Sequence, residues 1–262
     1  MNKLFIVKIG GNVLDDSAAL ERFLRDFAAI QEPKILVHGG GKIATNIGKR
    51  LGIESQYMNG RRITDAETLD VVTMVYGGLV NKQLVARLQS LDCNAIGVTG
   101  ADGNMIRATK RPVKDIDYGF VGDIDAEGVN TALLYFLLKQ NTIPVFAPLT
   151  HDAGKMLNTN ADTISSVLAI AMSKHFEVRL IFCFEKKGVL HDVTRDDSVI
   201  HELPRKMYEE LLGRHVFADG ILPKLENAYA AIHAGVKEVL IGDAGDLIRN
   251  TGRETAGTLI TS

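Results

Sequence analysis

Lys8, Asp162 and Lys224 are charged residues at positions where an α/β fold can present them to a ligand. Lys8 lies near the end of an apolar run, where burying an ammonium group is costly without an anionic partner. Asp162 falls in the first turn of one expected helix, and Lys224 follows Pro223 into another. Two such lysines could neutralise the charge on a transferring phosphoryl group, and the aspartate could orient them. Taken singly, each residue also has an ordinary structural explanation.

Two glycine-rich turns could bring backbone N–H groups close to an anion. Gly10 and Gly11 follow the first apolar run, and residues 38–41, His-Gly-Gly-Gly, follow the second and open a helix. Glycine lets the backbone approach a ligand, and a helix N-terminus favours phosphate or carboxylate. The second turn with Ala44 also fits a loose dinucleotide fingerprint, so a NAD(P)-dependent oxidoreductase is an alternative. That alternative leaves the two lysines and Asp162 without a role.

A substrate carboxylate could be held by the segment Asn59–Thr64, which forms a turn before an expected helix. A guanidinium in such a turn can grip a carboxylate in a bidentate fork, although surface arginines are more often solvated. The segment Leu157–Asp162 contains a second set of polar residues. Asn160 is a natural helix cap there, which accounts for that residue but leaves Asn158 unexplained.

Six short apolar runs are expected to form the sheet that positions these residues. They alternate with longer amphipathic segments, which indicates an α/β fold with helices around an open, mainly parallel sheet. The runs are Leu4–Ile9, Ile35–His38, Ala95–Thr99, Ile143–Ala147, Val178–Phe184 and Val236–Ile241. Two regions rich in Gly, Asp and Thr, Asn104–Asp123 and Thr150–Asn158, are predicted to be β-hairpins.

Helix boundaries are marked by capping residues. Ser17 precedes an apolar stripe, and Thr64 with Glu67 three residues later forms a capping box for a long helix. Gly52 is expected to end the helix that begins after Gly41.

Composition excludes several other classes of protein. With 262 residues, 24% of them charged, and a net charge of -2, the chain lacks the basic excess of a protein that binds nucleic acid or membrane surfaces. We therefore expect a small-molecule substrate. Cys93 and Cys183 lie in apolar stretches without metal or redox spacing, so we expect buried thiols in the reducing cytoplasm. No stretch approaches the roughly 18 apolar residues of a membrane span.

Six motifs, taken in order, resemble the amino acid kinase family from Lys3 to the C-terminus. The motifs are V-K-I-G-G at Val7–Gly11, V-H-G-G-G at Val37–Gly41, N-G-R-R-I-T at Asn59–Thr64, V-N-K at Val80–Lys82, L-N-T-N-A-D at Leu157–Asp162 and D-G-I-L-P-K at Asp219–Lys224. The resemblance implies a three-layer αβα fold with β-hairpins over the substrate site. It also implies ATP-dependent phosphorylation of the γ-carboxylate of N-acetyl-L-glutamate, or of another N-acylglutamate, in arginine biosynthesis.

The resemblance assigns a role to each matching position. Lys8 and Lys224 would flank the γ-phosphoryl group of ATP, and Asp162 would hold both ammonium groups in place. The substrate would be bound by Gly40, Gly41, Arg62 and Asn158. ATP would be bound by Gly10, Gly11, Glu185, Lys186, Lys187, Gly188, Val189, Leu190, Val216, Phe217 and Ala218. Mg²⁺ would be held mainly by the nucleotide phosphates, without a protein metal site.

The resemblance also implies two lobes that share one continuous sheet. Residues 1–176 would form the N-acylglutamate-binding and dimerisation lobe, and residues 177–262 would form the ATP-binding lobe. The chain lacks the N-terminal helical extension of the arginine-inhibited hexamers of the family. We therefore expect an arginine-insensitive homodimer with no nucleic-acid or membrane partner.

Two positions depart from the family pattern. The segment Glu185–Val189 reads E-K-K-G-V where the family commonly has Asp-Val-x-Gly-Val, which predicts altered nucleotide affinity more readily than lost activity. A non-catalytic sensor is the alternative that this departure supports. Arg61 replaces a usually apolar residue, and its cation could recognise a longer acyl group such as succinyl. Other members of the family share the lysine-glycine opening, so a different substrate within the family is a further alternative.

Overall fold

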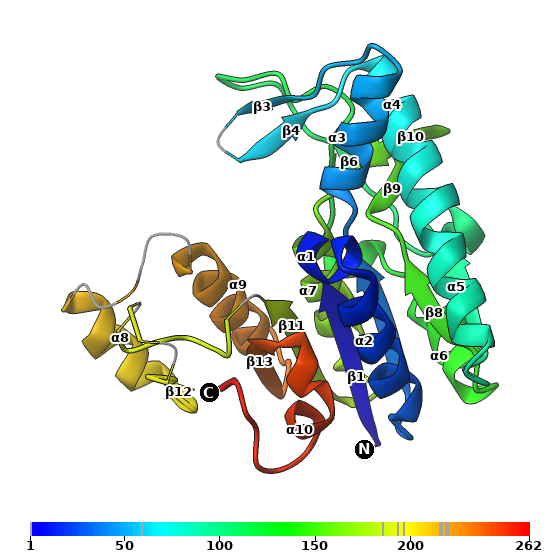
Figure 1. Ribbon diagram of the computed structural model, residues 1–262. Coiled ribbons are helices and arrows are strands. Elements are labelled where there is room, and N and C mark those ends of the chain that lie inside the picture. The colour runs from blue at the N-terminus through cyan, green and yellow to red at the C-terminus, as the bar shows by residue number, and fades with distance from the viewer. Residues whose placement is uncertain are drawn as a thin grey trace.

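An eight-stranded sheet forms the centre of the protein in the computed structural model (Figure 1). The structure describes residues 2–58, 60–184, 186–192, 194–195, 197–214, 217 and 221–262. The strands of this sheet, in spatial order, are β12 (Glu202–Pro204), β14 (Thr258–Thr261), β13 (Glu238–Asp243), β11 (Glu177–Phe184), β1 (Lys3–Ile9), β2 (Lys34–His38), β8 (Ile143–Phe146) and β5 (Ala95–Val98). Every neighbouring pair is parallel except β13 and β14.

This sheet confirms the predicted α/β class, and each of the six predicted strands is present. Strands β12 and β14 were not predicted, because runs of three and four residues are too short for a clear pattern. Since β11 pairs with β1, the sheet continues across the expected lobe boundary between residues 176 and 177. The division into two lobes itself stays a prediction.

Alternate residues of the central strand β1 face two helical layers. Phe5, Val7 and Ile9 pack into the core on one face, whereas Leu4 and Ile6 pack into the core on the other. The first face is covered by α1 (Gly11–Asp15), α2 (Ser17–Ala29), α3 (Gly41–Arg50), α4 (Ala66–Val72), the π-helix η1 (Thr73–Val80), α5 (Asn81–Gln89) and α10 (Leu247–Thr251). The second face is covered by α6 (Thr131–Lys139), α7 (Ala161–Met172), α8 (Arg205–Gly213) and α9 (Leu222–His233). Within the described ranges, none of the helices is long and apolar enough to cross a membrane.

Asp16 and Asp65 cap the α-helices α2 and α4. The carboxylate of Asp16 accepts hydrogen bonds from backbone N–H groups in the first turn of α2, and Asp65 does the same for α4. The predicted caps, Ser17 and Thr64, are therefore each wrong by one residue. Thr64 does not cap because its backbone pairs with a neighbouring loop. Gly52 follows α3 with φ +79°, as predicted for a helix end.

In the part of the chain that the structure describes, three small antiparallel hairpins lie outside the central sheet. The predicted hairpin at 150–158 is confirmed as β9 (Leu149–Asp152) and β10 (Lys155–Asn158). The predicted hairpin at 104–123 is reduced to the two-residue strands β6 (Thr109–Lys110) and β7 (Gly122–Asp123). The third hairpin, β3 (Gln56–Met58) and β4 (Arg61–Ile63), was expected only as a turn, and Figure 1 shows it at the top beside α3 and α4.

Backbone hydrogen bonds join these hairpins. The N–H of Thr64 donates to the carbonyl oxygen of Tyr118 at 2.9 Å, and the carbonyl oxygen of Thr64 accepts from Phe120 at 2.7 Å. The carbonyl oxygen of Phe120 in turn accepts from the N–H of Asn158 at 2.9 Å. The end of β4 and the end of β10 are therefore held by the same loop.

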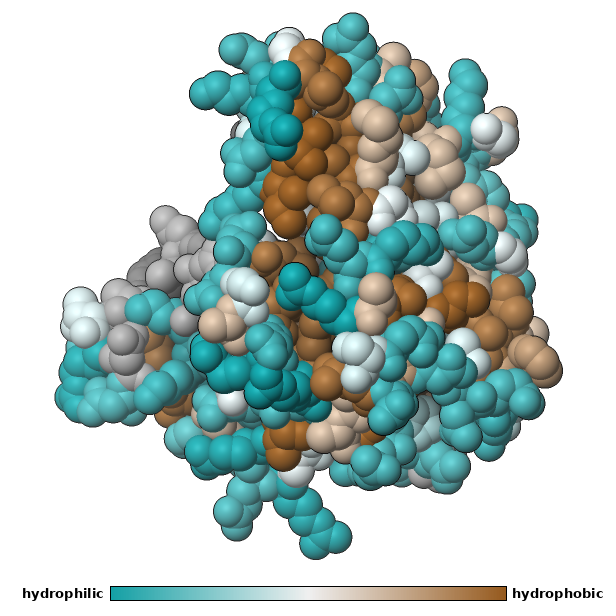
Figure 2. All heavy atoms as spheres, turned by 45° about the vertical axis from the view of Figure 1, so that its right-hand side comes forward, coloured by the Kyte–Doolittle hydropathy of each residue, from teal (hydrophilic) through white to brown (hydrophobic). Residues whose placement is uncertain are grey.

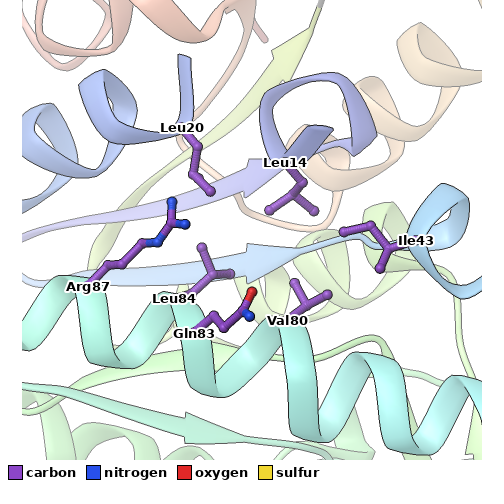
Figure 3. A pocket seen from close by; sticks show the side chains of 7 residues that line it. All are labelled: Leu14, Leu20, Ile43, Val80, Gln83, Leu84 and Arg87. Atoms are coloured by element: carbon purple, nitrogen blue, oxygen red, sulfur yellow. The ribbon is translucent and has the colours of Figure 1, made fainter. Parts of the chain in front are cut away.

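A small cavity of about 30 Å³ lies between α1, α2, α3 and the η1–α5 helix (Figure 3). Its walls are Leu14, Leu20, Ile43, Val80, Gln83, Leu84 and Arg87. A space of this size holds about one water molecule, so it is a gap in packing and no ligand site.

The contact between Gly119 and Thr64 can be tested with alanine. Gly119 has φ +74°, and a Cβ there would overlap the carbonyl oxygen of Thr64. Gly154 has φ +80° with no atom within 4 Å of such a Cβ, so it is a matched control. Gly154→Ala should lower the free energy of unfolding by about 1 kcal/mol through backbone strain.

Gly119→Ala should cost roughly 1–3 kcal/mol more than the control, because a backbone carbonyl cannot move aside as a flexible side chain can. Urea denaturation of both variants measures the difference. Equal losses in the two variants would contradict the close approach of the loop to β4.

Candidate active site

Lys8, Asp162 and Lys224 meet at one point although they come from three separate elements. Lys8 Nζ lies 2.8 Å from Asp162 Oδ1, and Lys224 Nζ lies 3.3 Å from Asp162 Oδ2. Lys8 is on β1, Asp162 is in the first turn of α7, and Lys224 is near the start of α9. One carboxylate therefore holds two ammonium groups, and the structure brings the three predicted catalytic residues together.

The alternation along β1 explains where Lys8 points. Lys8 has the same parity as Leu4 and Ile6, so its side chain faces the layer that contains α7. Helix α7 packs against β1 and β11, and Asn160 caps it by accepting a hydrogen bond from the Thr163 N–H at 3.1 Å. The capped first turn of α7 thus lies beside the end of the central strand.

The charge balance keeps Asp162 ionised. Burial of Asp162 would raise its pKa, but the charges of Lys8 and Lys224 outweigh burial, so the pKa lies below its ordinary value. The side chains are 13% exposed for Lys8 and 24% exposed for Asp162 and Lys224, so a ligand can reach the ammonium groups. Two positive charges against one negative charge leave this cluster attractive to anions.

A pocket of about 200 Å³ opens beside the two lysines. Its walls are Lys8, Gly10, Gly11, Val13, Phe182, Cys183, Phe184 and Lys224. Burial raises the pKa of Cys183 to about 12, so this wall is uncharged at neutral pH. The ammonium group of Lys224 lies 5.4 Å from the centre of the Phe184 ring, a cation–π distance. Cationic groups, two glycines and apolar sides make the pocket suitable for a phosphate group.

The two glycine-rich turns lie against each other. The backbone N–H of Gly39 donates a 3.0 Å hydrogen bond to the carbonyl oxygen of Ile9. Gly40 has φ +148°, and a Cβ there would lie 3.1 Å from the ring of Tyr76, so glycine is required at this position. Gly41 begins α3, so the N-terminus of this helix lies beside the end of β1.

Arg62 is 8% exposed and is held by three acceptors. Its guanidinium donates to the carbonyl oxygen of Gly41 at 2.9 Å, to Thr45 Oγ1 at 2.9 Å and to Ser55 Oγ. The guanidinium carbon lies 4.9 Å from the centre of the Tyr57 ring. Because arginine has five N–H donors and three are used, at most two remain for a substrate carboxylate. The structure thus places two predicted substrate-binding residues, Arg62 and Gly41, in direct contact.

Asn158 is connected to the segment that carries Arg62 by a hydrogen bond to Thr64. Asn158 Nδ2 donates to Thr64 Oγ1 at 3.0 Å. Thr64 directly follows β4 and lies two residues after Arg62. The predicted substrate-binding residues Arg62 and Asn158 are therefore joined through one short segment.

The predicted nucleotide loop follows β11. Lys186 and Lys187 are exposed, whereas the segment Gly188–Leu190 is buried. The N–H of Val189 donates to the Thr258 hydroxyl at 2.8 Å, and its carbonyl oxygen accepts from residue 200 at 2.8 Å. Both backbone polar groups of Val189 are thus occupied by the protein itself.

The remaining predicted nucleotide residues are placed only in part. Phe217 stacks on Tyr208 in the apolar core, with 5.6 Å between ring centres. Glu185, Val216 and Ala218 lie outside the described residues. Residues 186–190 and Phe217 do not line the pocket beside Lys8 and Lys224. Their contact with adenine and ribose stays a prediction.

Several residues that build the site were not predicted. Thr45, Ser55 and Tyr57 position Arg62 but drew no attention in the sequence. Thr45 lies four residues after Gly41, so helical periodicity could have placed the two on one face. Ser55 and Tyr57 carry no such signal, because their position depends on the β3–β4 hairpin.

Arg61 precedes Arg62 on β4 but is exposed. Successive side chains of a strand point to opposite faces, so Arg61 points away from the face that carries Arg62. The structure therefore gives no support to a contact between Arg61 and the acyl group of a substrate held by Arg62.

Known proteins resemble this chain over nearly its full length. The profile of the amino acid kinase family matches residues 3–243. The chain belongs to the amino acid kinase family. The acetylglutamate kinase of Parabacteroides distasonis is 56% identical over 253 residues, which cover 96% of this chain and 98% of the relative. That of Cytophaga hutchinsonii is 55% identical and covers 100% of both chains.

Solved structures share the amino acid kinase fold. N-acetylglutamate synthase from Neisseria gonorrhoeae superimposes with a TM-score of 0.80 at 21% identity, over 100% of this chain and 59% of that chain. Carbamate kinase from Giardia lamblia bound to AMP-PNP superimposes with a TM-score of 0.70 at 13% identity, over 100% of this chain and 98% of that chain. The family match decides for a kinase over the nicotinamide-dependent oxidoreductase.

Because the pKa of Asp162 is lowered in the folded protein, we expect Asp162 to stabilise the fold at neutral pH and to lose this effect in acid. Its folded pKa lies below the unfolded value of about 3.9, so the stabilisation is present above that value and lost as the pH falls through the folded pKa. The difference in unfolding free energy between wild type and Asp162→Asn should therefore stay constant from pH 7 to about pH 5 and change below about pH 4.

Urea titrations at several pH values measure this difference. Asp26→Asn is the control, because burial raises the pKa of Asp26. The contribution of Asp26 to the free energy of unfolding must therefore vary with pH in the direction opposite to that of Asp162. A pH-independent difference for Asp162→Asn would contradict the shared ion pair.

Proposed function

We propose that this chain transfers the γ-phosphoryl group of ATP to the γ-carboxylate of N-acetyl-L-glutamate in arginine biosynthesis. The observation that carries the proposal is the pair of lysines, Lys8 and Lys224, held by one carboxylate at the carboxyl end of the central strand. The relatives named acetylglutamate kinase, at 55–56% identity over nearly the whole chain, support this choice of substrate.

The reaction needs no general base, because the attacking carboxylate is already ionised at neutral pH. A carboxylate oxygen attacks the γ-phosphorus, the bond to the bridging oxygen breaks, and ADP leaves with that electron pair. Both reactants are anions, so the protein must align them and reduce their repulsion. Lys8 and Lys224 would stabilise the charge on the γ-phosphoryl oxygens, and Asp162 would keep their ammonium groups in place.

At the other end of the site, Arg62 would bind the α-carboxylate of the substrate with its remaining donors. Its three hydrogen bonds to the protein fix the guanidinium before the substrate arrives, which lowers the entropy lost on binding. Asn158 would bind beside it. The backbone N–H groups of Gly40 and Gly41 would bind oxygens of the acylated substrate.

ATP fits the lysine pocket by charge, since its phosphates are anionic and the pocket presents two ammonium groups beside Gly10 and Gly11. Among the residues described here, no three His, Cys, Asp or Glu side chains are grouped to hold a metal ion. Asp162 is committed to the lysines, so Mg²⁺ would be held mainly by the nucleotide phosphates. When bound, it would neutralise part of their charge.

Two further assignments belong to this proposal. Cys93 and Cys183 are free and buried, which supports a reducing compartment and therefore the cytoplasm. Residues 1–176 would form the acylglutamate-binding and dimerisation lobe, which contains Arg62 and Asn158, and residues 177–262 would form the ATP-binding lobe, which contains Lys224.

Trapping the acyl phosphate with hydroxylamine tests the activity. Purified protein with ATP and Mg²⁺ should give hydroxamate from N-acetylglutamate and none from glutamate, and N-succinylglutamate in parallel measures the acyl preference. Lys8→Ala and Lys224→Ala should each lower kcat by about 10²–10³-fold, the usual loss for one charge-stabilising group.

Lys49→Ala, which alters an exposed lysine in the last turn of α3, is the control and should leave the rate unchanged. Hydroxamate from no acylated substrate would reject the proposed reaction. Tight ATP binding in the same preparation would then favour the sensor.

We further propose a homodimer formed on the side of η1, α5 and β5. Met74 is 55% exposed, Leu79 is 40% exposed and Ile96 is 39% exposed. β5 is the end strand of the sheet in the described part of the chain, so one of its edges is open. Figure 2, which brings this side forward, shows apolar side chains gathered in a band on the upper half of the molecule. A second copy would cover both the apolar side chains and the strand edge.

Light scattering tests the dimer. Wild type should have twice the 28.5 kDa mass of the chain, and Leu79→Arg should shift it toward the monomer because a buried guanidinium would lack a partner. Leu212→Arg is a matched control, since Leu212 is 39% exposed on α8 in the other helical layer. A monomeric wild type, or equal effects of both variants, would contradict this interface.

A further inference from the structure

The V-N-K motif at residues 80–82 has no part in the mechanism above, yet its asparagine lies in a buried hydrogen-bond network. Asn81 is 1% exposed and His38 is 0% exposed. Asn81 Nδ2 lies 3.1 Å from His38 Nε2 and 2.9 Å from the carbonyl oxygen of Val145. Asn81 Oδ1 accepts a hydrogen bond from Lys82 Nζ at 3.1 Å.

The neighbours of Asn81 fix the orientation of its amide. The carbonyl oxygen of Val145 can only accept, so it requires the amide nitrogen. The ammonium group of Lys82 can only donate, so it requires the amide oxygen. The amide nitrogen of Asn81 therefore faces His38.

These contacts also decide which ring nitrogen of His38 carries the proton. Nδ1 lies 2.7 Å from the carbonyl oxygen of Gly39, which can only accept, so Nδ1 donates. Nε2 faces the amide nitrogen of Asn81, so Nε2 accepts. A neutral ring satisfies both contacts, whereas a protonated ring would set two donors against each other. Consistently, burial lowers the pKa of His38 to about 4, although the bond to Gly39 opposes this, and the charge of Lys82 lowers it further.

A π-helix brings Asn81 to this position. Helix η1 ends at Val80, and Asn81 is the first residue of α5. A Cβ at Gly40 would lie 3.1 Å from the ring of Tyr76 and 3.6 Å from Val80 Cγ2. The π-helix and the first residue of α5 therefore present Tyr76, Val80 and Asn81 together to the turn at residues 38–41. Such segments are rare and often lie at functional sites.

We propose that Asn81 is a positioning residue, which acts through His38 to fix the glycine turn that receives the acylated substrate. The argument rests on the planarity of one peptide unit. The carbonyl of Gly39 and the N–H of Gly40 belong to the same trans peptide and point in opposite directions. Holding the carbonyl toward His38 therefore directs the N–H of Gly40 to the other side. The inference depends on the proposed role of this turn in substrate binding.

Gly97 on β5 closes the network from the other side. Lys82 Nζ donates to the carbonyl oxygen of Gly97 at 2.8 Å. A Cβ at Gly97 would overlap Asn81 Oδ1. Gly97→Ala should therefore displace the amide of Asn81 while leaving both Asn81 and His38 in the sequence.

The first experiment reads the protonation of His38 without substrate. The wild-type chain is labelled with ¹⁵N-histidine, and the His38 signals among the seven histidines are identified by their loss in His38→Asn. We expect a neutral Nδ1–H ring from pH 8 to about pH 5. The Nε2–H tautomer, or titration near the ordinary pKa of about 6.5, would overturn the inference. Asn81→Asp should convert the ring to imidazolium at pH 7, because a carboxylate then faces Nε2.

The second experiment separates binding of the two substrates. Asn81→Ala and Gly97→Ala should raise KM for the acylglutamate about tenfold or more, because a small displacement of a binding group is costly, and should leave KM for ATP within about twofold. Asn250→Asp is the control for a buried asparagine: Asn250 is 1% exposed, and its Oδ1 accepts from two backbone N–H groups at 3.0 Å. It should lower Tm without changing KM for the acylglutamate.

The outcomes separate this inference from the proposed function. A wild-type enzyme that phosphorylates acylglutamate, with unchanged KM in Asn81→Ala or an equal rise in both KM values, overturns the positioning role alone. A wild type that phosphorylates no acylglutamate overturns the proposed function and the role of the turn with it.

Discussion

Two positive charges held by one carboxylate are the interaction on which the rest of the site depends. The ammonium groups of Lys8 and Lys224 repel each other, and they stay side by side only if a negative charge lies between them. Asp162 meets this need from the first turn of α7, where the helix dipole also favours a carboxylate. Three elements from distant parts of the chain must therefore converge. The fold provides this because β1 is central, with α7 packed against its face.

The parallel sheet adds a second constraint, since it brings two glycine-rich turns to one edge. β1 and β2 are parallel neighbours, so both strands end beside each other, and each is followed by glycines. The hydrogen bond from Gly39 to Ile9 ties these turns together. The pocket beside Lys8 and Lys224 and the region where Arg62 contacts Gly41 are thus connected through these two turns. A displacement of either turn would therefore move backbone groups both at the pocket beside the lysines and near Arg62.

The sheet could be predicted because buried parallel strands appear as continuous apolar runs, and charged residues such as Lys8 stand out against them. The caps at Ser17 and Thr64 were misplaced because several polar residues adjoin each helix start and each is an acceptable cap. The β3–β4 hairpin was missed because its residues are mostly exposed and its stability comes from contacts with a distant loop. The contact between His38 and Asn81 spans 43 positions, so no local pattern could reveal it.

The reaction joins two anions, and this explains why the glycine turn must be held by an uncharged group. The site contains three positive charges, on Lys8, Lys224 and Arg62, and one negative charge, on Asp162. This net positive charge attracts both anionic reactants. The two ammonium groups do not by themselves align the reacting groups, because a lysine acts as a point charge without a preferred direction. Backbone N–H groups donate along a defined direction, and they can align a substrate only if the peptide is held in one orientation. The Nδ1–H of a neutral, buried His38 holds that peptide through the carbonyl of Gly39. Protonation would keep this bond but would set the Nε2–H against the amide nitrogen of Asn81, so the ring would lose the second contact that fixes its orientation.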